Sequence, residues 1–250
     1  MVVLKKTVLA VISLLFYVSC VNTTDPADLP QNLVLLSSWP LNIQDPSALS
    51  KSHLPGHFLT VSDNSGNVYL ITDEGEIVEI LPMGGHDLEG IEYVPEKNLI
   101  YMLEEQRRWV VSLTPQGVAL DTFRLDIPTQ NINDGPEGIA WHTVREQFFI
   151  VNEKNPAIMF VYDSLFNRVG QYPLSFAKDY SSIDYDQHTG YLWILSHESK
   201  LLARCNTEGV PDKLYITDLP KGEGVVVDSP NNRIYIVCDE TEKLYVFAFP

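Results

Sequence analysis

The chain is short of cysteine and of positive charge, and it has no long apolar run after its first 20 residues. Its three cysteines, Cys20, Cys205 and Cys238, are too few for a disulfide framework or a cysteine zinc site. Lys and Arg number 17 against 33 Asp and Glu, which gives a net charge of -16. An acidic surface lacks the basic patch that nucleic acids require, so we expect no nucleic-acid partner.

Long helical periodicity is also missing, which argues against α/β folds. The chain is 45% hydrophobic, and its apolar residues fall in short runs separated by turn-forming residues. This pattern predicts an all-β fold with a large core. We expect Cys205 and Cys238 to be two buried strand thiols, with a bridge between them as the alternative.

The first 19 residues have the features of a signal peptide. Lys5 and Lys6 precede an uncharged segment that is too short to span a bilayer. The segment Tyr17-Val18-Ser19-Cys20 resembles the lipobox of bacterial lipoproteins, so we expect Cys20 to carry a lipid. Ordinary secretion and an uncleaved anchor are the alternatives. Residues 20–32 would then be a tether and residues 33–250 the folded domain, attached to a membrane through the lipid anchor only.

One hairpin recurs along the rest of the chain, and its clearest copy spans residues 87–105. There, two short apolar strands flank a turn at Pro95-Glu96-Lys97-Asn98. Five copies follow one another at intervals of 42 to 48 residues, which is the length of a propeller blade. Residues 33–41 form a strand without a hairpin partner, and the last copy lacks a fourth strand. The pattern therefore predicts a five-bladed β-propeller closed by the N-terminal strand pairing with the last blade.

Two positions of the hairpin form columns that lie sixteen residues apart in every copy. The first column contains Ser47, Glu89, Glu137, Ser181 and Glu223, and the second contains Asp63, Glu105, Glu153, His197 and Asp239. The first column begins strand one and the second ends strand two, so an antiparallel hairpin brings both to the same rim of the central channel. Seven of the ten positions are acidic, whereas chance would place about one acid there.

Crowded carboxylates repel one another unless a cation lies among them. Oxygen ligands suit a hard cation, and a flexible ring of them suits calcium better than magnesium. We therefore predict a calcium ion bound by some of the seven acids, which are Asp63, Glu89, Glu105, Glu137, Glu153, Glu223 and Asp239. The alternative is that these side chains cap strands and bind amides of neighbouring blades.

Three further side chains are candidates for binding a ligand at the rim. His197 is expected to hydrogen-bond to Glu153 or Asp239, and a general base is the alternative. Arg107 and Lys154 follow the second column in blades two and three, where they could meet an anionic ligand or lie in solvated loops.

Several short sequence segments resemble segments of one known family, and they occur in the same order as in that family over most of residues 33–249. They are Asp87-Leu88-Glu89-Gly90-Ile91, Gly135-Pro136-Glu137-Gly138-Ile139-Ala140, Val151-Asn152-Glu153-Lys154-Asn155-Pro156 and Leu195-Ser196-His197-Glu198-Ser199. They resemble the SdiA-regulated domain family, the YjiK-like envelope proteins of bacteria. The resemblance implies a propeller in the bacterial cell envelope, facing the periplasm or the outside, with calcium association in some members.

Two functions are consistent with these observations. The first is a monomeric, calcium-binding envelope lipoprotein that binds a small molecule or a protein at its acidic channel mouth. The second is a calcium-dependent hydrolase of ester or phosphoester substrates, in which the ion is a Lewis acid. A phosphate site should bring Lys or Arg to the metal, and the two columns contain neither, so binding is favoured.

Overall fold

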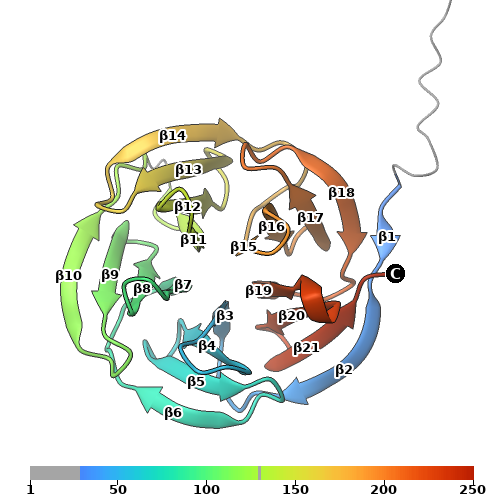
Figure 1. Ribbon diagram of the computed structural model, residues 1–250, viewed down its shortest axis with the longest axis horizontal. Helices are drawn as coiled ribbons and strands as arrows, with labels where there is room; N and C mark the ends of the chain where they lie inside the picture. The colour runs from blue at the N-terminus through green and yellow to red at the C-terminus, as the bar shows by residue number, and fades with distance from the viewer. Residues whose placement is uncertain (1–28, 129–130) are drawn as a thin grey trace, which may run out of the picture.

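The computed structural model describes residues 29–128 and 131–250. The signal peptide, Cys20 and most of the expected tether lie outside these residues. Within them, twenty-one strands form five sheets arranged as a ring around a central axis (Figure 1). The predicted five-bladed β-propeller is therefore confirmed.

Each blade contains four antiparallel strands, of which the first lies nearest the axis, and blade 4 has a fifth strand beyond its fourth (Figure 1). Blade 1 contains β3 (Pro46–Lys51), β4 (His57–Ser62), β5 (Val68–Thr72) and β6 (Ile77–Leu81). Blade 2 contains β7 (Leu88–Val94), β8 (Leu99–Glu104), β9 (Trp109–Leu113) and β10 (Ala119–Arg124). Blade 3 contains β11 (Pro136–His142), β12 (Gln147–Asn152), β13 (Ile158–Asp163) and β14 (Arg168–Pro173).

The last two blades both receive strands from the N-terminal segment. Blade 4 contains β15 (Ser182–Asp186), β16 (Tyr191–Ser196), β17 (Leu201–Cys205) and β18 (Pro211–Ile216), and the short β1 (Gln31–Asn32) pairs in parallel with β18. Blade 5 contains β19 (Gly222–Asp228), β20 (Arg233–Cys238), β21 (Lys243–Ala248) and β2 (Val34–Pro40). The first strand, β1, begins at Gln31. The folded domain therefore starts two residues before the expected residue 33.

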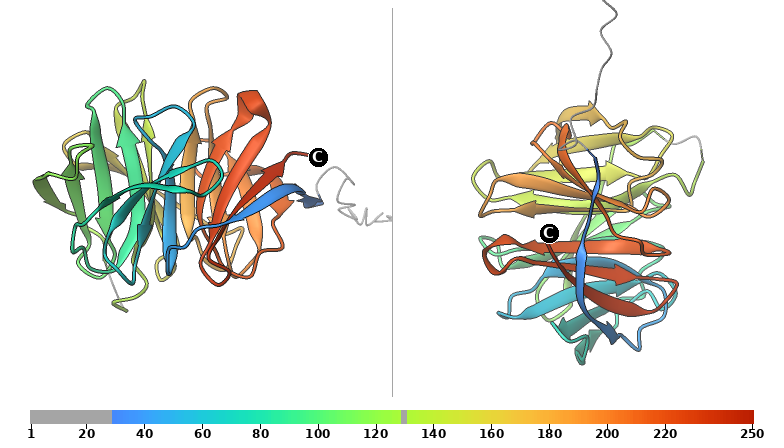
Figure 2. Two further views of the ribbon diagram at one scale, coloured as in Figure 1. Left: turned by 90° about the horizontal axis from the view of Figure 1, so that it is seen from below. Right: turned by 90° about the vertical axis from the view of Figure 1, so that its right-hand side faces the viewer.

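Closure of the ring depends on the antiparallel pairing of β2 with β21. Val34 lies opposite Ala248 and Pro40 lies opposite Lys243, with one bulge between these two pairs. This pairing supplies the fourth strand that the last hairpin lacks, as the sequence predicts. Figure 2 shows β2 crossing the outer side of the ring beside the C-terminal strand.

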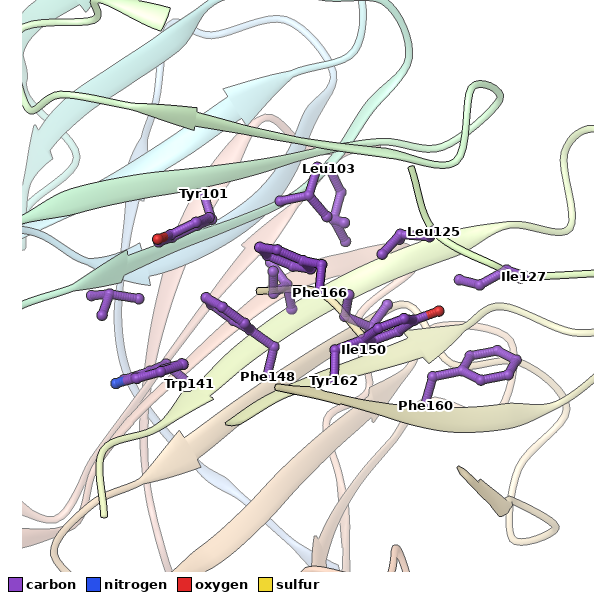
Figure 3. Close-up of a cluster of buried hydrophobic side chains, with 13 residues drawn as sticks. Tyr101, Leu103, Leu125, Ile127, Trp141, Phe148, Ile150, Phe160, Tyr162 and Phe166 are labelled. Carbon is purple, nitrogen blue, oxygen red and sulfur yellow. The ribbon is translucent and has the colours of Figure 1, made fainter. Parts of the chain in front are cut away.

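Inner and middle strands are apolar on both faces because each blade packs between two neighbours. In β12, Phe148 and Ile150 face blade 2, whereas Phe149 and Val151 face blade 4. The period of two along a strand sends alternate side chains to opposite faces, so both sets are buried. Figure 3 shows the cluster between blades 2 and 3, where Phe148 stacks on Phe166 with ring centroids 4.6 Å apart.

Outside the sheets, the described residues contain one short helical turn, η2 (Ser229–Asn231), between β19 and β20. In the described part of the chain, no helix has the length and apolar character needed to cross a membrane. Cys205 and Cys238 are free thiols, both buried, in agreement with the favoured expectation.

Small residues allow the inner strands of adjacent blades to approach one another closely. Gly138 of β11 faces β15, and a Cβ atom at this position would lie 2.8 Å from the backbone nitrogen of Ile183. Real Cβ atoms essentially never come that close to another heavy atom, so this position requires glycine. The Glu-Gly pairs of the repeat therefore have a packing role as well as an acidic side chain.

We predict that Gly138→Ala destabilises the fold by about 2 kcal/mol, because two backbones must move apart to admit the methyl group. Gly170→Ala is the matched control, since its Cβ would meet the Val161 side chain at an ordinary 3.7 Å. Urea unfolding measures both free energies. Equal losses in the two variants would show that the approach of β11 to β15 does not constrain the ring.

Candidate functional site

A backbone bulge presents the first-column side chain at the channel mouth. In β7, Leu88 pairs with Glu104 and Gly90 pairs with Leu103, so Glu89 is an extra residue in the ladder. The same shift occurs at the start of β3, β11 and β19, which makes Ser47, Glu137 and Glu223 bulge residues too. Bulges redirect side chains at the ends of strands. Blade 4 differs, because β15 begins only after Ser181.

All seven predicted acids line one cavity of about 380 Å³ at this mouth, together with Ser47 and His197. The structure therefore brings together nine of the ten column residues. Ser181 is absent from the lining because its buried hydroxyl donates to the backbone oxygen of Gly222, at 2.8 Å. The rim geometry expected from the hairpin spacing is present, whereas the metal-binding roles stay a prediction.

Sequence reasoning missed a third column, two residues before the first. It contains Asp45, Asp87, Gly135, Asp179 and Lys221. In four blades, the backbone oxygen of the third-column residue accepts a hydrogen bond from the backbone amide of the second-column residue. In blade 2, for example, the Glu105 amide donates to the Asp87 oxygen at 2.9 Å. Asp45, Asp87 and Lys221 line the cavity. The constant offset of two residues was the signal that could have found them.

Burial and mutual repulsion raise the pKa of several carboxyl groups at the mouth. Burial, followed by the charges of Glu89 and Glu223, raises the pKa of Glu137 well above its usual range. The pKa of Glu89 is raised in the same way, by burial and then by Glu223 and Asp63. Glu105 is 4% exposed, and burial together with a hydrogen bond to Asp87 raises its pKa to about 8. A cation placed among these groups would relieve the repulsion.

Two cations already neutralise one side of the mouth. His197 Nδ1 lies 2.9 Å from Asp179 Oδ2 and 3.5 Å from Glu223 Oε1. Burial opposes its charge, but these two carboxylates prevail and raise the pKa of His197 to about 10. The expectation that His197 binds Glu153 or Asp239 is wrong, because the third-column Asp179 lies in its own blade and closer. Lys221 pairs with Asp239 and lies 3.5 Å from Glu223.

Arg107 and Lys154 do not line the cavity. Arg107 turns back to Glu104, with Nη1 and Oε2 3.0 Å apart, and its guanidinium lies over the Trp109 ring. Lys154 bridges Glu153 at 2.7 Å and Glu198 at 2.8 Å. Arg107 is thus paired outside the lining, whereas Lys154 neutralises the mouth acid Glu153 without lining the cavity itself.

Three carboxylates of blades 1 and 2 form a group that could hold a metal ion. Carboxylate oxygens of Asp63, Asp87 and Glu89 lie within 4.8 Å of one another. Two oxygens that bind one calcium ion at about 2.4 Å are separated by no more than about 4.8 Å. Asp87 adopts a positive φ of 59°, which turns this third-column residue toward the cavity that it lines. These three residues from blades 1 and 2 could hold a cation.

The alternative of carboxylates binding neighbouring-blade amides also occurs, but mostly deeper in the channel. At the mouth, Glu105 accepts the amide of Gly135 in blade 3 at 2.6 Å. Further along the axis, Glu92 accepts the amide of Trp141 at 3.3 Å and Asp184 accepts that of Val227 at 2.8 Å. Inter-blade capping is therefore a separate function, carried largely by other acids.

We predict that His197→Gln destabilises the protein by about 3 kcal/mol, because Asp179 is fully buried and would lose its counter-charge. Lys200→Gln in the same loop is the control: it breaks an exposed pair with Asp218, at 3.5 Å, and should cost less than about 1 kcal/mol. Denaturant midpoints at neutral pH test both values. A loss no larger than that of the control would contradict a structural role for the His197 ion pair.

Comparison with solved structures supports the fold alone. Glutaminyl cyclase from Myxococcus xanthus superimposes with a TM-score of 0.72 at 12% identity, over 89% of this chain and 100% of that one. A catalytically inactive variant of virginiamycin B lyase from Staphylococcus aureus, solved with quinupristin, gives a TM-score of 0.53 at 16% identity, over 82% of this chain and 66% of that one.

The sequence comparison is more specific. The profile of one family, described as SdiA-regulated, matches residues 40–248, from the end of β2 to the last residue of β21. The match includes all five hairpins and the mouth that they form, so it covers the whole ring rather than a single motif. This chain therefore belongs to the SdiA-regulated family.

Proposed function

We propose that this protein is a lipoprotein of the bacterial cell envelope whose propeller binds a calcium ion at the channel mouth and acts as a binding module. The observation that carries the metal proposal is the convergence of Asp63, Asp87 and Glu89, whose carboxylate oxygens lie within 4.8 Å of one another. Such an all-oxygen set favours a hard cation.

Charge balance supports placing the ion beside blades 1 and 2. His197 and Lys221 neutralise the acids near blades 4 and 5. No Lys, Arg or His of the described residues forms an ion pair with the three carboxylates of blades 1 and 2. Lys221 acts on Asp63 and Glu89 only from beyond ion-pair distance. Calcium takes six to eight oxygens, so further oxygens, from backbone carbonyls and water, would complete the shell. The remaining mouth would accept a polar small molecule or a protein loop.

We predict that calcium raises the melting temperature and that a chelator lowers it again, because an ion bound only by the folded state stabilises it by about 2.7 kcal/mol at a hundredfold excess over Kd. Asp87→Asn and Glu89→Gln should each weaken binding at least about tenfold. Glu208→Gln, an exposed acid outside the mouth, is the control with the same charge change. Unchanged melting with chelator, and no calcium bound at millimolar concentration, would rule the site out.

A hydrolase is the second candidate, and one feature of the mouth favours it. Lys221 lines the cavity and provides the cationic side chain that the two sequence columns lack. With a calcium ion as Lewis acid, Glu137 would be a protonated carboxyl available as a general acid, since burial and neighbouring charges raise its pKa. Lys221 is already paired with Asp239, which weakens this case.

Assays of carboxylic esters and phosphoesters with calcium present separate the two functions. We expect no turnover above background, because the excess of acids at the mouth repels anionic phosphoesters and Lys221 is already paired with Asp239. Turnover that is lost in Glu137→Gln and retained in Glu208→Gln would favour the hydrolase instead.

The envelope location depends on Cys20, which lies outside the described residues. We predict that Cys20→Ser moves the protein from the membrane fraction to the soluble fraction and abolishes labelling with radioactive palmitate, since no lipid can then attach. Cys205→Ser is the control, because this thiol is buried in blade 4. Membrane association that persists without Cys20 would indicate an uncleaved N-terminal anchor.

A further inference from the structure

A second cavity, of about 640 Å³, lies between blades 5 and 1. Its lining comes from the end of β3 and the start of β4, and from the end of β19 and the start of β20. The channel mouth is formed by the opposite ends of these strands, so the cavity opens on the other face of the ring. Its volume falls within the range of small-molecule sites.

The floor of this cavity is aromatic. Phe58 is buried, and its ring lies 4.6 Å from that of the partly buried Tyr235, at an angle of 50°. Tyr235 packs on the core cluster between blades 5 and 1, which includes Phe58 and Val237. Packing fixes both rings, so they offer a rigid apolar surface at little entropic cost to a ligand.

Two cations line the same cavity. Lys51 Nζ donates to the backbone oxygen of Val227 at 3.0 Å, which holds it across the seam between the blades. Arg233 Nη1 donates to the backbone oxygens of Asn231 at 3.2 Å and Asn232 at 3.0 Å. Within residues 29–128 and 131–250, no hydrogen bond involves Nη2 or Nε of Arg233. The Nη1 bonds therefore hold the Arg233 guanidinium in place, and its Nη2 and Nε groups can still donate hydrogen bonds to a ligand.

Two carboxylates complete the lining. Asp228 Oδ2 accepts a hydrogen bond from Asn231 Nδ2 at 2.7 Å. Asp73 has no hydrogen bond or ion pair to any of the described residues. Burial raises the pKa of Tyr235, and the charges of Asp73 and Asp228 raise it further, so both acids lie near its ring. The cavity thus combines an apolar floor with two cationic and two anionic side chains, of which Lys51 and Asp73 are exposed.

We propose that this cavity is a binding site for a small zwitterion with an apolar side chain, such as an aliphatic amino acid or a short peptide. The ligand's carboxylate pairs with Arg233 and Lys51, its ammonium group pairs with Asp73, and its side chain packs on Phe58 and Tyr235. A ligand with a single charge would pair with the groups of one sign only, so it would gain less from the cavity than a zwitterion. The site is independent of metal binding at the mouth.

Calorimetric titration of the full-length protein, with calcium chelated, tests this proposal. The probes are L-leucine and the dipeptide leucylleucine, compared with N-acetyl-L-leucine and L-leucine methyl ester, which each lack one charge. We expect at least one zwitterion to bind at millimolar concentration or below, and both singly charged analogues to bind at least about tenfold more weakly.

Variants distinguish this cavity from any other site. Arg233→Gln and Asp73→Asn should each weaken zwitterion binding at least about tenfold. Arg145→Gln is the matched control, because Arg145 is exposed in the β11–β12 turn on the same face and outside the lining. No binding of either zwitterion at millimolar concentration, equal binding of the analogues, or equal effects of Arg233→Gln and Arg145→Gln would each overturn the proposal.

Discussion

The inner strands of the blades approach one another closely because the residue after each first-column position is small, and at Gly138 and Gly224 a Cβ would meet the backbone of the adjacent blade. The five small residues are Ala48, Gly90, Gly138, Ser182 and Gly224. A side chain at Gly138 would collide with the backbone of the next blade, so the approach is fixed by van der Waals contact rather than by attraction. The narrow ring in turn forces the side chains at its rim together, and most of these are carboxylates.

Charge is distributed unevenly around that rim. On one side, His197 and Lys221 pair with acids and make a self-contained network. On the other side, Asp63, Asp87 and Glu89 face one another without a cation paired to them among the described residues. The packing energy of five blades holds these carboxylates in place despite their repulsion, as active and binding sites in rigid folds commonly require. The excess negative charge is thus a property of one sector of the mouth.

Periodicity made most of the fold predictable. The five hairpins, their order and the closing strand all follow from repeat spacing, because a blade cannot bury its faces alone. The same spacing placed the seven acids at one rim. The repeat spacing did not identify the partner of His197, because that partner is Asp179. Asp179 belongs to the third column, which lies outside the two columns predicted from the sequence. Loop position left open whether Arg107 and Lys154 meet a ligand or solvent, and the structure pairs Arg107 with Glu104 and Lys154 with Glu153. Individual pairings depend on side-chain geometry that a repeat does not encode.

The β2–β21 pairing joins the first long strand of the domain to its last. β2 precedes its partner by roughly two hundred residues, so its apolar edge stays unpaired until the last blade has formed. The other blades build their four strands from consecutive hairpins and do not depend on so distant a segment. Loss of β21 would therefore open the whole ring rather than shorten one sheet.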